Sequence, residues 1–298
     1  MGTPLTYAAS EGDGEMVEIL LKHGANIESR DNLGRSSLAI AADSITRVSP
    51  SSCYKQLLQA GADPEAANRQ GKTPIWHAAV QNAQGALNVF LTRDGIDPQT
   101  ATHRASELIA PVAQAGGISV LQVLRGYGAD LNYKNSAGET AISASLSTSH
   151  TSMPAFQYLL REGVDVNVQD KNGFTPLHQA VHMHNPRAIK LLLEHPRTDI
   201  SIKDNRGDTP FDLAMRGINP SRTEDYDEVD RREMLLLLLN HGVTEPESGV
   251  LQELLLIAVQ EACKDVFEAL LKHWRSHLQF TDDVVVRVLE KYPHMQDH

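Results

Sequence analysis

Histidines are the side chains of this sequence whose type and spacing could support chemistry. There are 13 of them among 298 residues, and the tightest cluster is His178, His182 and His184. His178 and His182 are four residues apart, which puts both on one face of a helix at a spacing that can bind zinc. No Glu follows the first of them, and no Cys or carboxylate is close in the sequence. We therefore expect no metal or other cofactor, and we keep His178 and His182 as the candidate ligand pair should a metal bind.

The other reactive residues show no catalytic pattern. We find no Ser-His-Asp arrangement, no phosphate-binding glycine-rich loop and no Cys-x-x-Cys, and Gly116-Gly117 matches no phosphate motif. Catalytic partners are assembled in space, however, and a fold alone does not exclude activity. An enzyme or small-ligand-binding protein with a pocket around His77, His178 and His182 therefore stays open as an alternative.

A short helical unit positions the histidine cluster. Thr175 stands where a helix should begin, and Pro176 suits the first helical position because it has no N–H that needs a partner. The apolar residues that follow recur at helical spacing, and residues 189–193 predict a second, more apolar helix. Upstream, residues 170–173 form a predicted turn in which Gly173 can take a positive φ. The unit is thus a turn followed by two helices.

This unit recurs along most of the chain. Its openings begin near residues 3, 36, 73, 106, 140, 175 and 209, which are 33 to 37 residues apart. The second helices of several units end on glycine, which can adopt the left-handed conformation that closes a helix. The period, and openings such as Thr73-Pro74-Ile75 and Thr175-Pro176-Leu177-His178, resemble the ankyrin repeat, whose signature is a 33-residue period with T-P-L-H-x-A. The resemblance covers roughly residues 1–245.

The resemblance implies an all-α ankyrin-repeat solenoid of helix-turn-helix units with β-turn fingers. We expect a repeat domain over residues 1–245, and a divergent eighth repeat with a C-terminal helical cap over residues 246–298. Similar proteins use the signature histidine, here His178, to brace adjoining turns. Trp76 takes that position in the third repeat and is expected to pack against a neighbouring repeat, while His77 takes the next position, which usually faces the concave groove.

Function follows from the same resemblance. We expect a protein–protein interaction scaffold or adaptor that binds another protein through the concave groove. Its candidate contacts are the exposed row on the first helices and the neighbouring finger residues. They are Tyr7, Arg35, Lys72, His77, Phe174, Gln179, His182 and Arg216. A regulatory segment of a larger signalling protein is a further alternative, which the abrupt start at the first repeat favours.

Composition narrows the class of partner. The formal net charge is −11, which argues against sequence-independent binding to nucleic acid or to an anionic membrane. The two cysteines, Cys53 and Cys263, lie in different repeats and no N-glycosylation sequon occurs, which fits an intracellular protein of the cytoplasm or nucleus. No apolar run reaches the length needed to span a membrane.

Two segments depart from the regular pattern. In repeat four, Pro111 should kink or shorten the expected first helix, and Gly116-Gly117 should loosen the next turn. We therefore expect the weakest joint of the stack there.

In repeat seven, residues 216–233 form an acidic insertion, which is expected to be a solvated loop. It is either tolerated surface growth or a docking or phosphorylation segment.

Overall fold

A computed structural model gives the fold of the chain. It describes residues 2–43, 53–92, 97–135, 138–147, 152–216 and 228–241, together with 266, 268–270 and 272. For residues 215–216 and 228–232 only the backbone is described. The regular structure in these segments is helical, with no strand among them, and one isolated antiparallel bridge joins Arg30 and Ser36. The chain divides into two units, residues 1–164 and 165–298.

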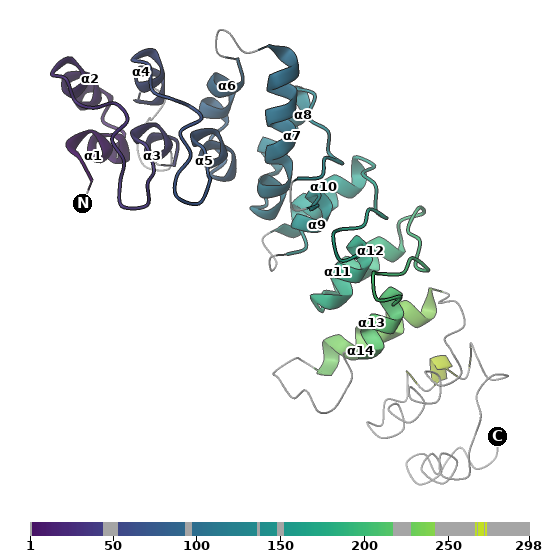
Figure 1. Cartoon of the computed structure of the whole chain (residues 1–298). Coiled ribbons are helices and arrows are strands. Elements are labelled where there is room, and N and C mark those ends of the chain that lie inside the picture. Colours follow the sequence, from purple (N-terminus) through teal and green to yellow (C-terminus); the bar gives the residue numbers. More distant parts are fainter. Residues whose placement is uncertain are drawn as a thin grey trace, which may run out of the picture. The chain divides into compact units, whose positions relative to one another are not determined.

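The first unit consists of five helix pairs (Figure 1). Neighbouring first helices pack on one another, as do neighbouring second helices. The first helices are α1 (Pro4–Glu11), α3 (Ser37–Asp43), α5 (Pro74–Val80), α7 (Pro98–Gln114) and α9 (Ala141–Ala144). The second helices are α2 (Gly14–Lys22), α4 (Cys53–Gln59), α6 (Gln84–Thr92), α8 (Ile118–Gly126) and α10 (Met153–Arg161). Buried alanine pairs, such as Ala41-Ala42 and Ala78-Ala79, allow the first helices to approach closely.

The second unit contains two described helix pairs, α11 (Pro176–His182) with α12 (Pro186–Leu193), and α13 (Pro210–Arg216) with α14 (Glu228–Asn240). α11 packs on α13, and α12 packs on α14. The acidic residues 217–227 lie outside the described residues. So does the expected cap over residues 246–298, apart from five isolated positions. The proposed boundary at residue 245 therefore stays a prediction.

The helix starts confirm the expected caps. Thr3, Thr73 and Thr175 each accept a hydrogen bond from the backbone N–H three residues on, at 3.3–3.4 Å. In each case a proline occupies the first helical position, where its missing N–H costs nothing. At Thr175 the cap is reciprocal, because the Nδ1 atom of His178 accepts a hydrogen bond from the Thr175 N–H at 3.2 Å.

Glycines in the left-handed region close the second helices, as the sequence predicts. Gly24, Gly61, Gly128 and Gly163 have φ between 74° and 93°. At the first three, the glycine N–H and the following N–H bond back to carbonyls of the last helical turn, which satisfies acceptors that the helix leaves open. The helix end thus turns directly into the next finger.

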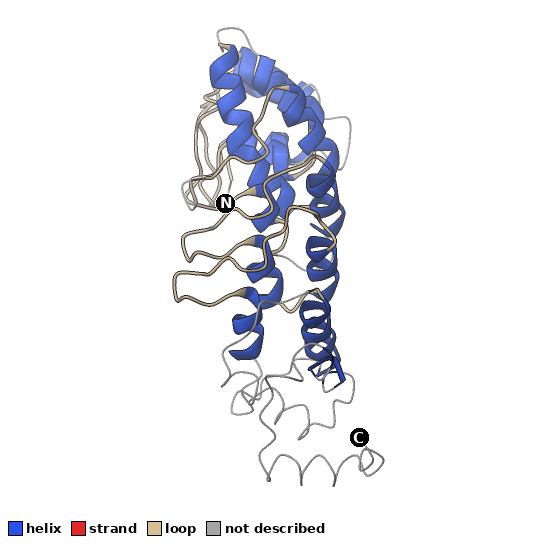
Figure 2. Ribbon diagram, turned by 90° about the vertical axis from the view of Figure 1, so that its right-hand side faces the viewer, coloured by secondary structure: helices blue, strands red, loops and turns tan. Residues whose placement is uncertain are grey.

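Each described finger is built around one Asp or Asn side chain. At Asp31, the carboxylate accepts hydrogen bonds from the N–H groups of Leu33 and Arg35, at 2.9 and 2.8 Å. The same pattern, with a positive-φ glycine in fourth place, recurs in residues 68–72, 135–139, 170–174 and 204–208. Figure 2 shows the fingers as loops that project from the helices. The turn chemistry is therefore local to five residues.

Repeat four differs from the expectation. Its first helix, α7, is 17 residues long and begins at Pro98 rather than near Ser106, so the expected shortening at Pro111 is wrong. Asp97 caps it by accepting from the N–H groups of Gln99 and Thr100 at 3.0 Å. Residues 93–96, between α6 and α7, lie outside the described residues. Pro111 lies in the last turn of α7, where its missing N–H removes a single helical bond.

Candidate protein-interaction surface

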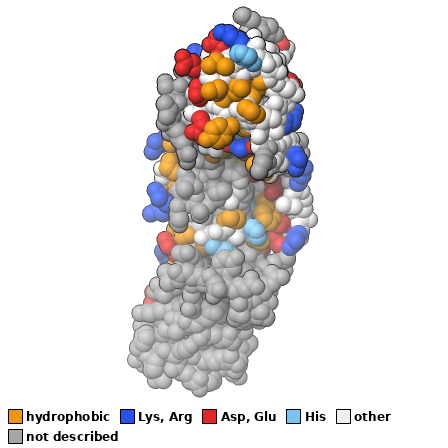
Figure 3. Space-filling view, turned by 90° about the vertical axis from the view of Figure 1, so that its left-hand side faces the viewer, with side chains coloured by type: hydrophobic (Ala, Val, Ile, Leu, Met, Phe, Trp, Pro, Cys, Tyr) orange, Lys and Arg blue, Asp and Glu red, His pale blue; other side chains and the backbone are white. Residues whose placement is uncertain are grey.

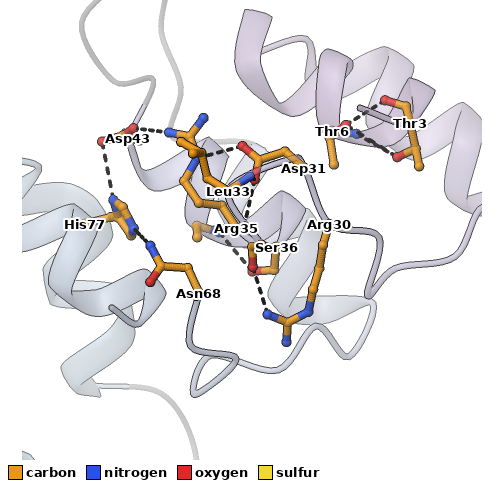
Figure 4. Close-up of polar contacts among 12 residues, drawn as sticks. Thr3, Thr6, Arg30, Asp31, Leu33, Arg35, Ser36, Asp43, Asn68 and His77 are labelled. Atoms are coloured by element: carbon orange, nitrogen blue, oxygen red, sulfur yellow. Dashed lines mark hydrogen bonds and ion pairs between the residues drawn. The ribbon is translucent and has the colours of Figure 1, made fainter. Parts of the chain in front are cut away.

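A chain of charged and polar side chains crosses the first unit from finger to helix to helix (Figure 4). Arg35 bonds through Nε to Oδ2 of Asp31 at 2.8 Å and through Nη1 to Oδ2 of Asp43 at 2.6 Å. The other carboxylate oxygen of Asp43 lies 3.5 Å from Nδ1 of His77. Asn68 completes the chain, with its Nδ2 atom 3.4 Å from Nε2 of His77. We call Asp31, Arg35, Asp43 and His77 the charged brace, because it ties α3 to the finger before it and to α5.

The brace holds its two carboxylates ionised. The hydrogen bond from His77 is the largest cause that lowers the pKa of Asp43, and it outweighs the effect of burial, with Arg35 adding a favourable charge. At Asp31, burial alone would raise the pKa, but the hydrogen bonds and charge of Arg35 outweigh it and the net shift is downward. Asp31 and Asp43 therefore form a fixed pair of negative charges around Arg35.

His77 lies differently from the expectation. His77 was expected on the exposed row, but it is only 8% exposed and faces Asp43 of the preceding repeat. As oriented, the Asn68 amide donates to Nε2, so the proton of His77 sits on Nδ1 and points at the carboxylate. Trp76 is half-buried, and its ring lies 4.4 Å from Nζ of Lys72, an attractive cation–π distance. Lys72 and Trp76 are therefore partly accessible at the start of repeat three.

Two large side chains on the first helices and fingers of the first unit are exposed among the described residues. Tyr7, on α1, is 69% exposed, and Leu33, in the finger that carries Asp31 and Arg35, is 59% exposed. Tyr7 thus fulfils the expectation of an exposed row on the first helices. A tyrosine and a leucine that gain little from packing within the chain are available for contact with another molecule.

In the second unit, Phe174 organises the histidines that the sequence singled out. Its ring stacks on that of His178, with centroids 5.6 Å apart and planes 15° from parallel. His182 meets the same ring edge-on at 5.9 Å, and its own side chain is exposed. Phe174 and Gln179 are half-buried. These three accessible residues are the part of the expected row that α11 and its finger present.

His178 itself is a structural residue. It is fully buried, and its Nε2 atom donates to the carbonyl oxygen of Asp208 at 3.0 Å, which leaves Nδ1 as the acceptor for Thr175. Both ring nitrogens are thereby used within the protein. The structure brings no group of three metal-ligating side chains together among the residues it describes. The role expected from the resemblance, bracing the adjoining turn, accounts for every polar atom of this ring.

Sequence reasoning missed part of this surface. Asp43 is the last described residue of α3, and nothing within its own repeat marks it as the partner of His77 in the next repeat. Leu33 is an apolar residue inside a polar turn, which is a signal that could have been read. The side chain of Arg216 lies outside the described part of the chain, so its place on the row stays a prediction.

The described helices define a class of protein: an all-α protein made of stacked helix pairs with projecting turns. A family model described as ankyrin repeats (3 copies) matches residues 1–68 and 109–217. The chain belongs to the ankyrin repeat family. The interval between these two matched segments, residues 69–108, includes the start of the extended α7.

Curated relatives share this repeat region. The chain is 27% identical over 199 residues to SH3 and multiple ankyrin repeat domains protein 2 of Homo sapiens, a match that covers 66% of this chain and 10% of the relative. It is 26% identical over 204 residues to the E3 ubiquitin-protein ligase KEG of Arabidopsis thaliana, covering 64% and 12%. It is 37% identical over 100 residues to Ankyrin repeat and SOCS box protein 16 of Mus musculus, covering 32% and 22%. The chain thus spans less than a quarter of the length of each of these relatives.

Solved structures agree on the fold. The human ASB11 ankyrin repeat domain matches 82% of this chain and 100% of its own, with a TM-score of 0.61 and 19% identity. The ankyrin repeat domain of Bcl-3 matches 71% and 93%, with a TM-score of 0.55 and 23% identity. Together with the family match, they establish an all-α ankyrin-repeat solenoid, a type of domain that serves as a protein-interaction module. No helix within the described segments is long and apolar enough to cross a lipid bilayer.

Proposed function

We propose that this chain is a protein-interaction scaffold or adaptor, and that it binds its partner protein through the first helices and fingers of the first unit. The observation that carries the proposal is the exposure of Tyr7 on the first helix α1 and of Leu33 in the finger that also carries Asp31 and Arg35 of the charged brace. Tyrosine and arginine are the residue types in which binding energy concentrates at protein interfaces.

The charged brace supports this role in a second way. Its groups are already fixed by one another at 2.6–3.5 Å, so a partner would not have to order them on binding. Arg35 keeps a quarter of its side chain exposed, and Asp43 nearly as much. The surface therefore offers an apolar anchor beside oriented charges of both signs, which suits recognition of a protein segment that carries an apolar residue next to polar ones.

The relatives named above support this proposal through the way the matched segment lies within their longer chains. The matched segment makes up only 10–22% of each of these three relatives, an arrangement that suits an interaction module within a longer chain. We extend to this chain only that arrangement: a repeat region that captures a protein for a larger assembly. The cytoplasm or nucleus is the compartment in which we expect it to act.

The test is site-specific photo-cross-linking in cells. A benzophenone amino acid at Tyr7 should trap one partner protein, identified by mass spectrometry, and the same label at Met183 serves as control. Met183 is also exposed, at 44%, but lies in the second unit. Leu33→Ala should reduce capture at Tyr7 by roughly 30-fold, the equivalent of about 2 kcal/mol for an interface hot spot. Equal trapping at both positions, or capture unaffected by Leu33→Ala, would contradict the proposal.

A further inference from the structure

The outer face of α2 is apolar and open. Met16 is 43% exposed and Ile19 is 49% exposed, while Leu20 is half-exposed and His23 is exposed. These four residues follow the i, i+3, i+4, i+7 spacing of one helix face. Val17, on the other side of the same helix, is fully buried against the rest of the unit. α2 therefore has two apolar sides, and only one is covered by the described part of the chain.

This second apolar side calls for a physical explanation. A helix face that meets water is normally polar, and apolar side chains on it are stabilised when another surface covers them. Figure 3 looks onto this end of the first unit and shows hydrophobic side chains gathered on it, with acidic side chains along one edge and basic and histidine side chains at the upper end. A gathered apolar patch rimmed by charge is typical of a protein interface.

The charges along α2 are divided by sign. Glu15 and Glu18 lie in its first half, while Lys22 and His23 lie at its end. Glu15, Glu18 and Lys22 fall on the helix edge that flanks Ile19. Lys22 and Glu18 form an ion pair at 2.6 Å within the helix, and more than half of each side chain is exposed. Such an exposed pair is weak, so both charges remain available to another molecule.

We propose that the outer face of α2 binds a second copy of this chain. Two α2 helices placed antiparallel about a two-fold axis at Ile19 would set Glu15 of one copy beside Lys22 and His23 of the other, twice. The same operation would bury Ile19 against its own symmetry mate, and Met16 and Leu20 against the apolar face of the partner helix. A two-fold interface uses one patch on both copies, so the patch must complement itself. The charge division along α2 meets that requirement, since each end carries the sign that the opposite end needs.

The test is analytical ultracentrifugation of the intact chain from ~1 to ~100 µM, the range in which a small interface associates reversibly. The wild type should shift from monomer to dimer as concentration rises. Ile19→Glu should remain monomeric, while the control Leu33→Glu, which places the same charge at another exposed apolar site, should dimerise like the wild type. Circular dichroism should show that both variants keep their helix content.

Charge variants make the geometry falsifiable without touching the apolar core. Glu15→Lys and Lys22→Glu should each weaken the dimer at least severalfold, because each places like charges opposite one another. The double variant should restore association, because it reverses both signs together. A wild type that stays monomeric at ~100 µM would overturn the proposal, and so would a double variant that is no tighter than the single ones. A monomer would leave the patch to a different protein.

Discussion

His178 donates from Nε2 to the carbonyl oxygen of Asp208 at 3.0 Å, although the two residues are 30 positions apart. The bond joins the first helix of one repeat to the finger of the next. His178 also closes its own helix start by accepting from the Thr175 N–H. One buried ring therefore couples a local cap to the stacking of two repeats. Only the neutral form with its proton on Nε2 makes both bonds, because a protonated Nδ1 could not accept from Thr175.

The stability of the second unit should therefore depend on pH through His178. Burial lowers the pKa of this histidine below its ordinary value of 6.5, against smaller opposing effects of nearby carboxylates and the Asp208 carbonyl. The folded state then binds fewer protons than the unfolded state just below pH 6.5, so stability falls as the pH drops through that value toward the folded pKa. Urea melts at about pH 7.5 and about pH 5.5 should show this loss.

His178→Gln is the matched variant, because glutamine keeps a donor and an acceptor but does not titrate. It should be less stable than the wild type near neutral pH by about 1–3 kcal/mol, since the buried bonds cannot all be remade. Its loss of stability between the two pH values should be smaller than that of the wild type. Identical pH dependence in the two proteins would show that other groups account for it.

Thr175→Ala should lower the free energy of unfolding by on the order of 1 kcal/mol, because it removes the oxygen that caps α11. Thr140→Ala is the matched control. Thr140 also precedes a first helix and is also buried, but its side chain makes no capping bond to the backbone. In urea melts, Thr175→Ala should therefore lower the free energy of unfolding more than Thr140→Ala does. Equal losses would mean that the Thr175 cap bond contributes nothing beyond burial of the side chain.

The helix starts and ends were predictable because they rest on local chemistry. A Thr-Pro pair and a closing glycine carry their own geometry, and the helices begin one residue after the expected openings at residues 3, 36, 73, 140, 175 and 209. The same reasoning could have found α7, since Asp97-Pro98 has a capping residue followed by proline, as the openings at residues 3, 73, 175 and 209 do. The 33-residue period drew attention to Ser106 instead, which is buried inside α7.

The candidate surface was harder to predict because it depends on packing between repeats. His77 and Gln179 hold equivalent positions in the repeat, yet His77 is buried while Gln179 is half-exposed. The difference comes from Asp43, one repeat earlier, whose carboxylate faces the His77 ring. No spacing within one repeat can reveal such a partner, and the large Trp76 beside it completes the altered packing.

Gly173→Ala should destabilise the second unit more than Gly207→Ala does. Both glycines have positive φ, 79° and 86°, so both substitutions carry a strain of about 1 kcal/mol in the left-handed region. A Cβ at residue 173 would also lie 2.6 Å from the backbone nitrogen of Asn205 in the next finger, whereas a Cβ at residue 207 meets nothing within 4 Å. The extra overpacking should cost about 1–3 kcal/mol in urea melts. Equal effects would mean that neighbouring fingers do not approach as closely as described.

His77→Ala should destabilise the first unit by about 1–3 kcal/mol, because it removes a buried ring and its hydrogen bond to Asp43. Tyr7→Ala, the control on a neighbouring first helix, should change stability by less than about 0.5 kcal/mol, because its side chain is exposed.

The free energy of unfolding below about pH 4 tests the contact between His77 and Asp43 in a second way. The pKa of Asp43 is lowered from 3.8, so its contribution is present above that value and is lost as the pH falls through it toward the folded pKa. Asp43→Asn removes this titration, and should flatten the profile below about pH 4. A profile that keeps its slope in Asp43→Asn, with His77→Ala as stable as the wild type, would show that the charged brace does not hold α3 against α5.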